Sequence, residues 1–175
     1  MTNSEKYYVE KVAHDARESA EHDQTVQFDF PLTLEMVKRI IEHFGGTLVL
    51  KPESDDVDSN FYIKKNVEGK LEIYYNPEIP KSVLIMKLLH ELGHAFFDFD
   101  EMSVGQVMGC DGVEPNDQKA DLFARAFVMP REQFESDLVK QSTEDGKFDM
   151  IKLANHYGIG FMDTLTRGED LNLWH

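Results

Sequence analysis

The residues best suited to chemistry in this chain are two histidines with a glutamate between them, in the segment His90-Glu91-Leu92-Gly93-His94. Side chains four positions apart on an α-helix lie one above the other, so both imidazoles could reach one metal ion. Glu91 would lie beside that ion, where its carboxylate could accept a proton from a water molecule. The spacing therefore predicts a catalytic zinc site, with His90 and His94 as metal ligands and Glu91 as general base.

The sequence around this segment favours a helix over residues 82–97, which contain no proline and one glycine. Apolar residues recur there at helical spacing, and the three polar residues of the segment point roughly 180° away from them. An exposed helix that carried the pentapeptide by chance would not have so long an apolar face. The apolar stripe consists of Ile85, Leu88, Leu89, Leu92 and Phe96.

A catalytic zinc normally has three protein ligands and keeps one position for water. We expect the third ligand from a second helix over residues 117–129, which Pro130 would end. Asp117 and Asp121 are four positions apart and share a face of that helix. We predict Asp117 as the third ligand and Asp121 as the acceptor for the free ring nitrogen of a zinc-bound histidine. The two roles could be exchanged, and both acids could instead simply stabilise the helix N-terminus.

The combination of HELGH with the downstream sequence DQKADLFARAFVMP resembles the ImmA/IrrE family of metallopeptidases, whose second helix reads E-x-x-A-(N/D)-x-F-A. The resemblance covers roughly residues 34–170. It implies an α+β, zincin-like metallopeptidase core with Zn²⁺ as cofactor. It also implies a cytoplasmic protein of bacteria or their mobile elements. Its substrate would be a regulatory protein, such as a helix-turn-helix repressor of a phage or mobile element.

One departure from the family concerns the third ligand. The family has a glutamate where this chain has Asp117, whose side chain is one methylene shorter and starts about 1–1.5 Å further from the metal. Zinc–oxygen bonds of about 2.0–2.2 Å tolerate little slack. The second helix could pack closer, the metal could bind weakly, or Glu114 could replace Asp117. The alternative function is a zincin-like binding module that displaces a repressor by contact, without proteolysis.

The composition limits the partners that the protein can have. With 175 residues and 41% hydrophobic content, the chain can form one domain with a substantial core. Its 18 basic and 33 acidic residues give a net charge of −15, which argues against direct nucleic-acid binding and against an anionic membrane surface. An acidic surface would attract a basic protein, although solubility alone would also explain the charge. The oligomeric state is not indicated.

The single cysteine, Cys110, excludes an internal disulfide. Together with the absence of a signal peptide and of a long apolar run, it predicts a reducing, cytoplasmic compartment. Cys110 lies in a glycine-rich segment, and no histidine is placed to activate it. We therefore predict a packing or loop role for Cys110.

The chain divides into three predicted parts. Residues 1–30 form an N-terminal extension, which could be an accessory helix, a partner-binding arm or a frayed terminus. Residues 31–135 form the zincin-like core, and residues 136–175 form a C-terminal helical subdomain packed on the core. Alternating apolar residues predict a short strand at 26–30 within the extension.

Within the core we expect a helix at residues 34–44, a strand at 47–50 and a β-hairpin made of residues 61–65 and 70–75. These strands would form a small antiparallel sheet over the helices. We expect residues 71–75 to be the sheet edge that holds a substrate as an added strand.

The segment from residue 148 onward predicts a helix, a glycine turn and a second helix. This shape resembles a helix-turn-helix, but the second helix offers only Arg167 as a cation, which argues against DNA binding. The segment could instead dock a protein partner. We expect packing or surface roles for His156 and Tyr157, with stabilisation of an oxyanion by either of them as the alternative.

Overall fold

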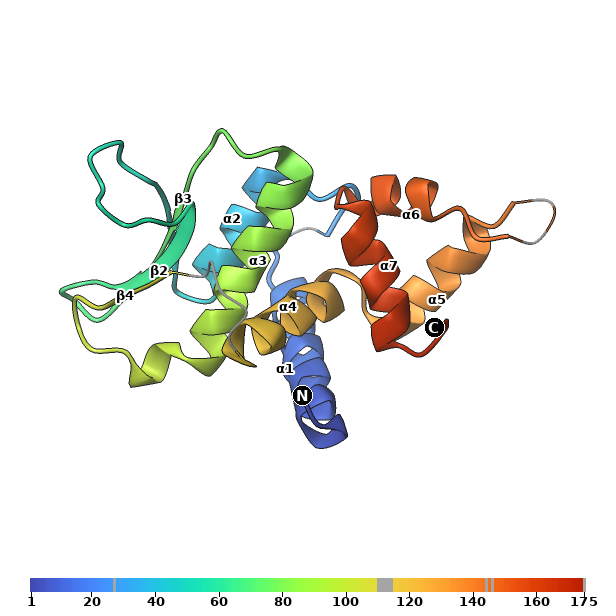
Figure 1. Ribbon diagram of the computed structural model, residues 1–175, viewed down its shortest axis with the longest axis horizontal. Helices are drawn as coiled ribbons and strands as arrows, with labels where there is room; N and C mark the ends of the chain where they lie inside the picture. Colours follow the sequence, from blue (N-terminus) through green and yellow to red (C-terminus); the bar gives the residue numbers. More distant parts are fainter. Residues whose placement is uncertain (27, 110–114, 144, 146, 175) are drawn as a thin grey trace.

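The computed structural model describes residues 1–174 of the protein, apart from residues 27, 110–114, 144 and 146 (Figure 1). The described part contains seven α-helices, one 3-10 helix and four β-strands. None of these helices is both long and apolar enough to cross a membrane. In chain order the elements are α1 (Asn3–Glu21), α2 (Leu34–His43), β1 (Thr47–Leu50), β2 (Phe61–Lys65), β3 (Leu71–Tyr75), α3 (Lys81–Phe97), η1 (Phe99–Glu101), β4 (Val107–Gly109), α4 (Pro115–Val128), α5 (Arg131–Lys140), α6 (Met150–Tyr157) and α7 (Phe161–Asp170).

Local sequence signals set the helix bounds. The Thr33 side chain accepts a hydrogen bond from the Met36 N–H at 3.3 Å, which satisfies a backbone donor at the start of α2. Gly158 ends α6 with a φ of 76°, a left-handed conformation that glycine adopts without steric cost. The helices predicted at residues 34–44 and 82–97 are confirmed as α2 and α3.

The sheet has the strand order β1-β3-β2-β4. Ile73 in the middle of β3 pairs in parallel with Leu48 on one side and in antiparallel with Ile63 on the other. Ile63 in turn pairs in antiparallel with Met108. The sheet is therefore mixed, and the expectation of a fully antiparallel sheet is corrected. The reason is that β3 inserts between β1 and β2, so that two strands of equal direction become neighbours.

This strand order also corrects the expected substrate edge. Residues 71–75 form β3, which pairs with β2 along its whole length and with β1 over residues 72–75. An added strand needs free backbone groups at a sheet edge, so β3 cannot offer that position. Among the described strands the edges are β1 and β4.

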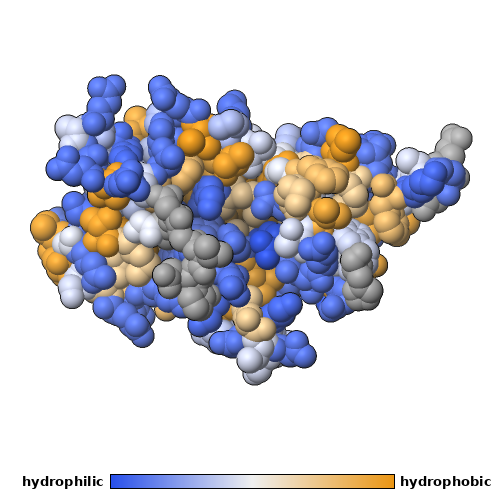
Figure 2. All heavy atoms as spheres, in the orientation of Figure 1, coloured by the Kyte–Doolittle hydropathy of each residue, from blue (hydrophilic) through white to orange (hydrophobic). Residues whose placement is uncertain are grey.

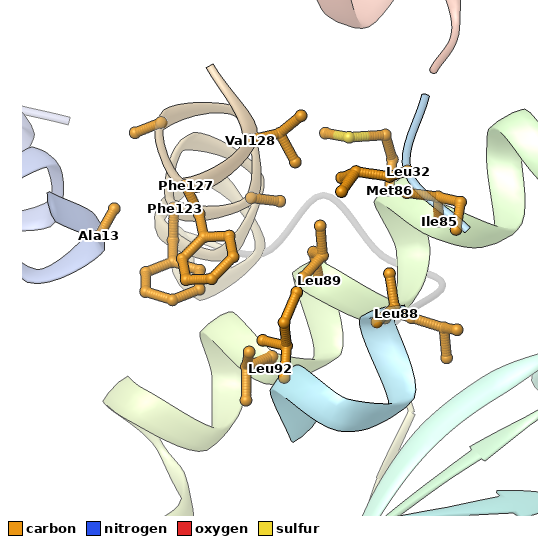
Figure 3. Close-up of a cluster of buried hydrophobic side chains, with 14 of the residues drawn as sticks. Ala13, Leu32, Ile85, Met86, Leu88, Leu89, Leu92, Phe123, Phe127 and Val128 are labelled. Atoms are coloured by element: carbon orange, nitrogen blue, oxygen red, sulfur yellow. The ribbon is translucent and has the colours of Figure 1, made fainter. Parts of the chain in front are cut away.

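Helix α3 lies between the sheet and α4, and its apolar side chains form the centre of the core. The sheet lies at one end of the molecule and α5–α7 lie at the other (Figure 1). Figure 3 shows leucines of α3 directed toward aromatic side chains of α4, with α1 on the far side of α4. The buried side chains drawn in Figure 3 include Leu88, Leu89 and Leu92 of α3, Phe123 and Phe127 of α4, and Ala13 of α1.

The N-terminal segment forms a packed accessory helix, the first of the three alternatives for it. Small and branched residues of α1 are buried against α4 at helical spacing. The strand predicted at residues 26–30 is wrong, because the described residues there form irregular structure with a bend at Phe30. Their apolar side chains pack on helices instead, with Phe28 against Phe127 and Phe30 against Tyr157. The buried residues of α1 include Val9, Ala13, Ala16 and Ala20.

The C-terminal segment forms the predicted helix, glycine turn and helix as α6 and α7. Arg167 is fully buried, and both terminal nitrogens of its guanidinium bind the Glu10 carboxylate of α1. Its Nε donates to the Met129 carbonyl at 2.9 Å. The one cation of α7 is therefore bound within the protein, and α7 has no arginine or lysine left to contact a phosphate backbone.

Several apolar side chains at this end of the molecule remain exposed, and Figure 2 shows hydrophobic surface beside hydrophilic surface in this region. The division of the chain into parts at residues 30 and 135 stays a prediction. Helices α1 and α7 both contact α4. The exposed apolar residues at this end include Phe148, Ile151, Phe161 and Met162.

Candidate metal centre

The two helices that carry the predicted ligands approach each other closely at Gly93. A Cβ atom added to Gly93 would lie 2.9 Å from the Ala120 Cα and 3.1 Å from the Ala120 carbonyl oxygen. Real Cβ atoms do not approach backbone atoms this closely, so only glycine fits here. Asp117 lies one turn before Ala120 on α4, and His94 directly follows Gly93 on α3. The contact therefore brings the shorter aspartate toward the histidines, as expected if the second helix packs closer.

The structure brings the three predicted ligands together. The Nε2 atoms of His90 and His94 are 3.1 Å apart, and the Nε2 of His94 is 3.3 Å from Oδ1 of Asp117. One donor atom from each of these residues lies within 4.8 Å of the other two. All three residues are buried. They are the only group of three or more possible ligands of this kind among the described residues.

A carboxylate accepts a hydrogen bond from the other nitrogen of each ring. The Nδ1 of His90 lies 2.6 Å from Oδ1 of Asp121, and the Nδ1 of His94 lies 2.6 Å from Oδ2 of Asp98. Carboxylates only accept hydrogen bonds, so each Nδ1 must carry the hydrogen. In neutral rings both Nε2 atoms then present lone pairs to each other and to Asp117. This arrangement is repulsive unless a cation lies among the three atoms.

These donors fit a divalent transition-metal ion. Bonds of about 2.0–2.2 Å in a tetrahedral site place ligand atoms about 3.3–3.6 Å apart. The separations of 3.1 and 3.3 Å are close to that range. Two imidazoles and one carboxylate form the ligand set of several catalytic zinc sites, which leave a fourth position for water. His90, His94 and Asp117 could therefore hold zinc as sequence reasoning expects.

Glu91 is fully buried within α3, between the two histidines in sequence. Burial of a carboxylate is costly unless the surroundings compensate for it. A bound dication would supply such compensation, and the carboxylate could then act as a base toward a water molecule. The position of Glu91 is thus compatible with its predicted role, which stays a prediction.

Asp121 lies in a charged environment that extends to α7. Burial alone would raise the pKa of Asp121, but the hydrogen bond from His90 and the nearby Arg125 and Lys87 lower it below its usual value. Asp163 of α7 has a raised pKa, chiefly because it is buried, with a further contribution from the charge of Asp121. Helix α7, which contacts α4, therefore lies near the outer part of the candidate metal centre.

Two residues of the centre were not anticipated from the sequence. Asp98 ends α3 and contacts His94, and the Asn116 side chain donates to Oδ1 of Asp98 at 2.8 Å. A signal for Asp98 did exist, because it lies four positions after His94 and so shares its helix face. No comparable signal existed for Asn116, whose partner is distant in sequence.

Other candidate residues are placed elsewhere or lie outside the described part. Glu114 and Cys110 belong to residues 110–114, which the structure does not describe. The Tyr157 hydroxyl donates to Asp137 at 3.0 Å, and the His156 ring packs on Phe30. These contacts support the packing roles that were expected for His156 and Tyr157.

Replacing Gly93 by alanine is expected to separate α3 from α4 and to weaken metal binding. The added methyl group would meet backbone atoms of Ala120, which cannot move without shifting the helix. Overpacking of this kind costs about 1–3 kcal/mol of stability. Urea unfolding and a zinc competition titration would measure the two effects. An alanine variant with unchanged stability and zinc affinity would contradict the close approach.

Comparisons with known proteins agree with the geometry. The model of peptidase family M78, described as the IrrE N-terminal-like domain, matches residues 42–167. No curated protein sequence matches the chain. Among solved structures, a Mycobacterium tuberculosis transcriptional regulator is similar, with a TM-score of 0.55 and 13% identity.

The structural alignment covers 95% of this chain and 47% of the regulator, so the chain spans about half of the regulator's length. At this identity the similarity concerns the fold alone. The family model, in contrast, covers most of the chain, including α3, α4 and the candidate ligands. The α+β arrangement with a small mixed sheet is compatible with a zincin-like core. The chain therefore belongs to the ImmA/IrrE family of metallopeptidase-like proteins.

Proposed function

We propose that the protein is a zinc-dependent metalloendopeptidase that hydrolyses a peptide bond in a regulatory protein. The observation that carries this proposal is the convergence of His90, His94 and Asp117 on one point, with a carboxylate behind each imidazole. Family membership supports a metallopeptidase-like domain. The candidate substrates are helix-turn-helix repressors of phages or mobile elements, encountered in the cytoplasm, as the family resemblance implies.

The residues of the centre divide the chemistry among them. When bound, zinc supplies Lewis acidity and lowers the pKa of a coordinated water toward about 7. The carboxylate of Glu91 takes a proton from the attacking water and passes it to the leaving amine. Asp121 holds the His90 ring with its Nε2 lone pair directed at the centre. Asp117 completes the protein ligands and adds one negative charge.

We place the backbone of the substrate along β4. This strand is an edge of the sheet, and its described pairing runs only to β2. It ends shortly before α4, which carries Asp117. An extended peptide could add to this edge through backbone hydrogen bonds. The net charge of −15 would favour a substrate with a basic surface.

A second candidate is a zincin-like binding module that displaces a repressor by contact alone. It is favoured by the burial of the centre, because His90, Glu91 and His94 are all at most 3% exposed. Exposed apolar residues on α6 and α7 would then form part of the contact surface. In this case zinc would stabilise the fold or would not be needed.

Metal analysis combined with a search for new peptide termini tests the proposal. Purified protein is expected to contain about one equivalent of zinc, as a site with three protein ligands would hold. Added to a lysate of the host, it should generate new N-termini that a chelator prevents and that added zinc restores. Protein that binds zinc but relieves repression without any cleavage would favour the binding module.

A further inference from the structure

We propose that Asp98 and Asn116 form a positioning pair, which orients His94 and sets the reach of Asp117 toward the same metal ion. The inference rests on the proposed metal centre and assigns roles to two residues beyond its three ligands. Asp98 lies at the end of α3, and Asn116 lies in the first turn of α4. Their side chains are joined by a hydrogen bond of 2.8 Å.

Asp98 determines which nitrogen of His94 can bind a metal. Its Oδ2 lies 2.6 Å from the His94 Nδ1, so the hydrogen stays on Nδ1 and the lone pair on Nε2. The Nε2 atom faces His90 and Asp117. A metal-binding histidine held in this way keeps both its tautomer and its ring orientation.

The location of Asp98 indicates that this contact outweighs an electrostatic cost. Asp98 is the residue that follows the last turn of α3, where the helix dipole disfavours a negative charge. Its side chain is only 11% exposed, so water solvates it poorly. A carboxylate at such a site needs compensating donors, and His94 and Asn116 supply one to each of its oxygens.

Asn116 connects the two helices that carry the ligands. It donates through Nδ2 to Asp98 and is followed directly by Asp117 in the chain. The hydrogen bond therefore ties the first turn of α4 to the end of α3. A ligand with an aspartate side chain tolerates little displacement of its backbone, since zinc–oxygen bonds are about 2.0–2.2 Å long. Asn116 thereby compensates for the shorter side chain of Asp117.

Co²⁺ and Zn²⁺ titrations of the purified full-length protein test the pair without any substrate. Asp98→Ala is expected to weaken metal binding by about 10–100-fold and to change the Co²⁺ absorption spectrum, because the orientation of His94 is lost. Asp98→Asn keeps an acceptor for Nδ1–H and should restore much of the affinity. Asp100→Asn, which removes an exposed carboxylate two residues away, is the matched control and should bind as the unmodified protein does.

A double-mutant cycle separates a pair from two independent contacts. As a single substitution, Asn116→Ala should weaken metal binding. In the Asp98→Ala background it should cause little further loss of metal affinity, because both changes break the same hydrogen bond. Additive effects would contradict the coupling. Affinities in Asp98→Ala and Asn116→Ala equal to that of the Asp100→Asn control would overturn the proposal.

The tautomer of His94 gives a readout that needs no metal. In metal-free protein, ¹⁵N shifts of the ring should report hydrogen on Nδ1, and Asp98→Ala should change that tautomer population. The positioning role would be overturned if the ring carried its hydrogen on Nε2, or if Asp98→Ala left the tautomer population unchanged. Unmodified protein that shows the expected tautomer but binds neither metal would instead contradict the proposed function, while the orientation of His94 by Asp98 would stand.

Discussion

Replacing Glu91 by glutamine is expected to leave metal binding intact and to slow peptide hydrolysis by about 10²–10⁴-fold, the usual contribution of a general base. Glutamine has almost the same shape as glutamate, so the fully buried position should still pack. The amide cannot take the proton from the attacking water at neutral pH. Zinc content, unfolding midpoint and cleavage rate of the purified variant would be measured together.

The matched control for this prediction is Glu101→Gln, which makes the same chemical change at an exposed position of η1. It should cleave at the normal rate. Normal cleavage by the Glu91→Gln protein would refute the general-base role. If that variant relieved repression as well as the unmodified protein while cleaving nothing, the binding module would be the better account.

Arg167→Ala is expected to destabilise the protein by about 3 kcal/mol, near the lower end of the range for breaking a buried ion pair. The truncation removes donors from Glu10 and from the Met129 carbonyl and leaves a cavity between α1, α4 and α7. We use the lower end because the Glu10 side chain is 31% exposed and can recover some hydration. For a chain of this size, the melting temperature should fall by roughly 6–12 °C.

Arg131→Ala provides the comparison, because Arg131 forms an exposed ion pair with Glu135 within α5. Such pairs contribute about 0–1 kcal/mol. Urea unfolding of both variants would give the two free energies. Equal losses of unfolding free energy in the two variants would show that burial of Arg167 adds nothing to the stability of the contact between α1, α4 and α7.

The main parts of the candidate centre were accessible from the sequence because they depend on helical spacing. His90 and His94 are four apart, as are Asp117 and Asp121, and spacing of four places side chains on one helix face. The convergence of the two helices could be expected from the small residue Ala120. The structure brings His90, His94 and Asp117 together, with Asp121 on His90. Their roles as ligands and support remain predictions.

Features that depend on long-range pairing were not accessible in this way. Adjacent strands were expected to pair in chain order, but β3 pairs with both β1 and β2 and is therefore internal. The three-residue strand β4 is too short to show a periodic pattern. The apolar alternation at residues 26–30 resembled a strand, yet none of the described strands pairs with this segment, and its aromatic side chains pack on helices instead. Asn116 finds its partner only after the helices have docked.

The helix that carries Asp117 at its beginning is anchored at its far end by residues of α1 and α7. Arg17 donates to the Phe127 carbonyl at 3.0 Å, and Arg167 donates to the carbonyl of Met129, directly beyond α4. A chain shortened to the family-matched residues 42–167 would keep every proposed metal donor. It would nevertheless lose Arg17 together with Glu10, the counter-ion of Arg167. The folded unit that supports the candidate metal centre is thus larger than the residues that the family model matches.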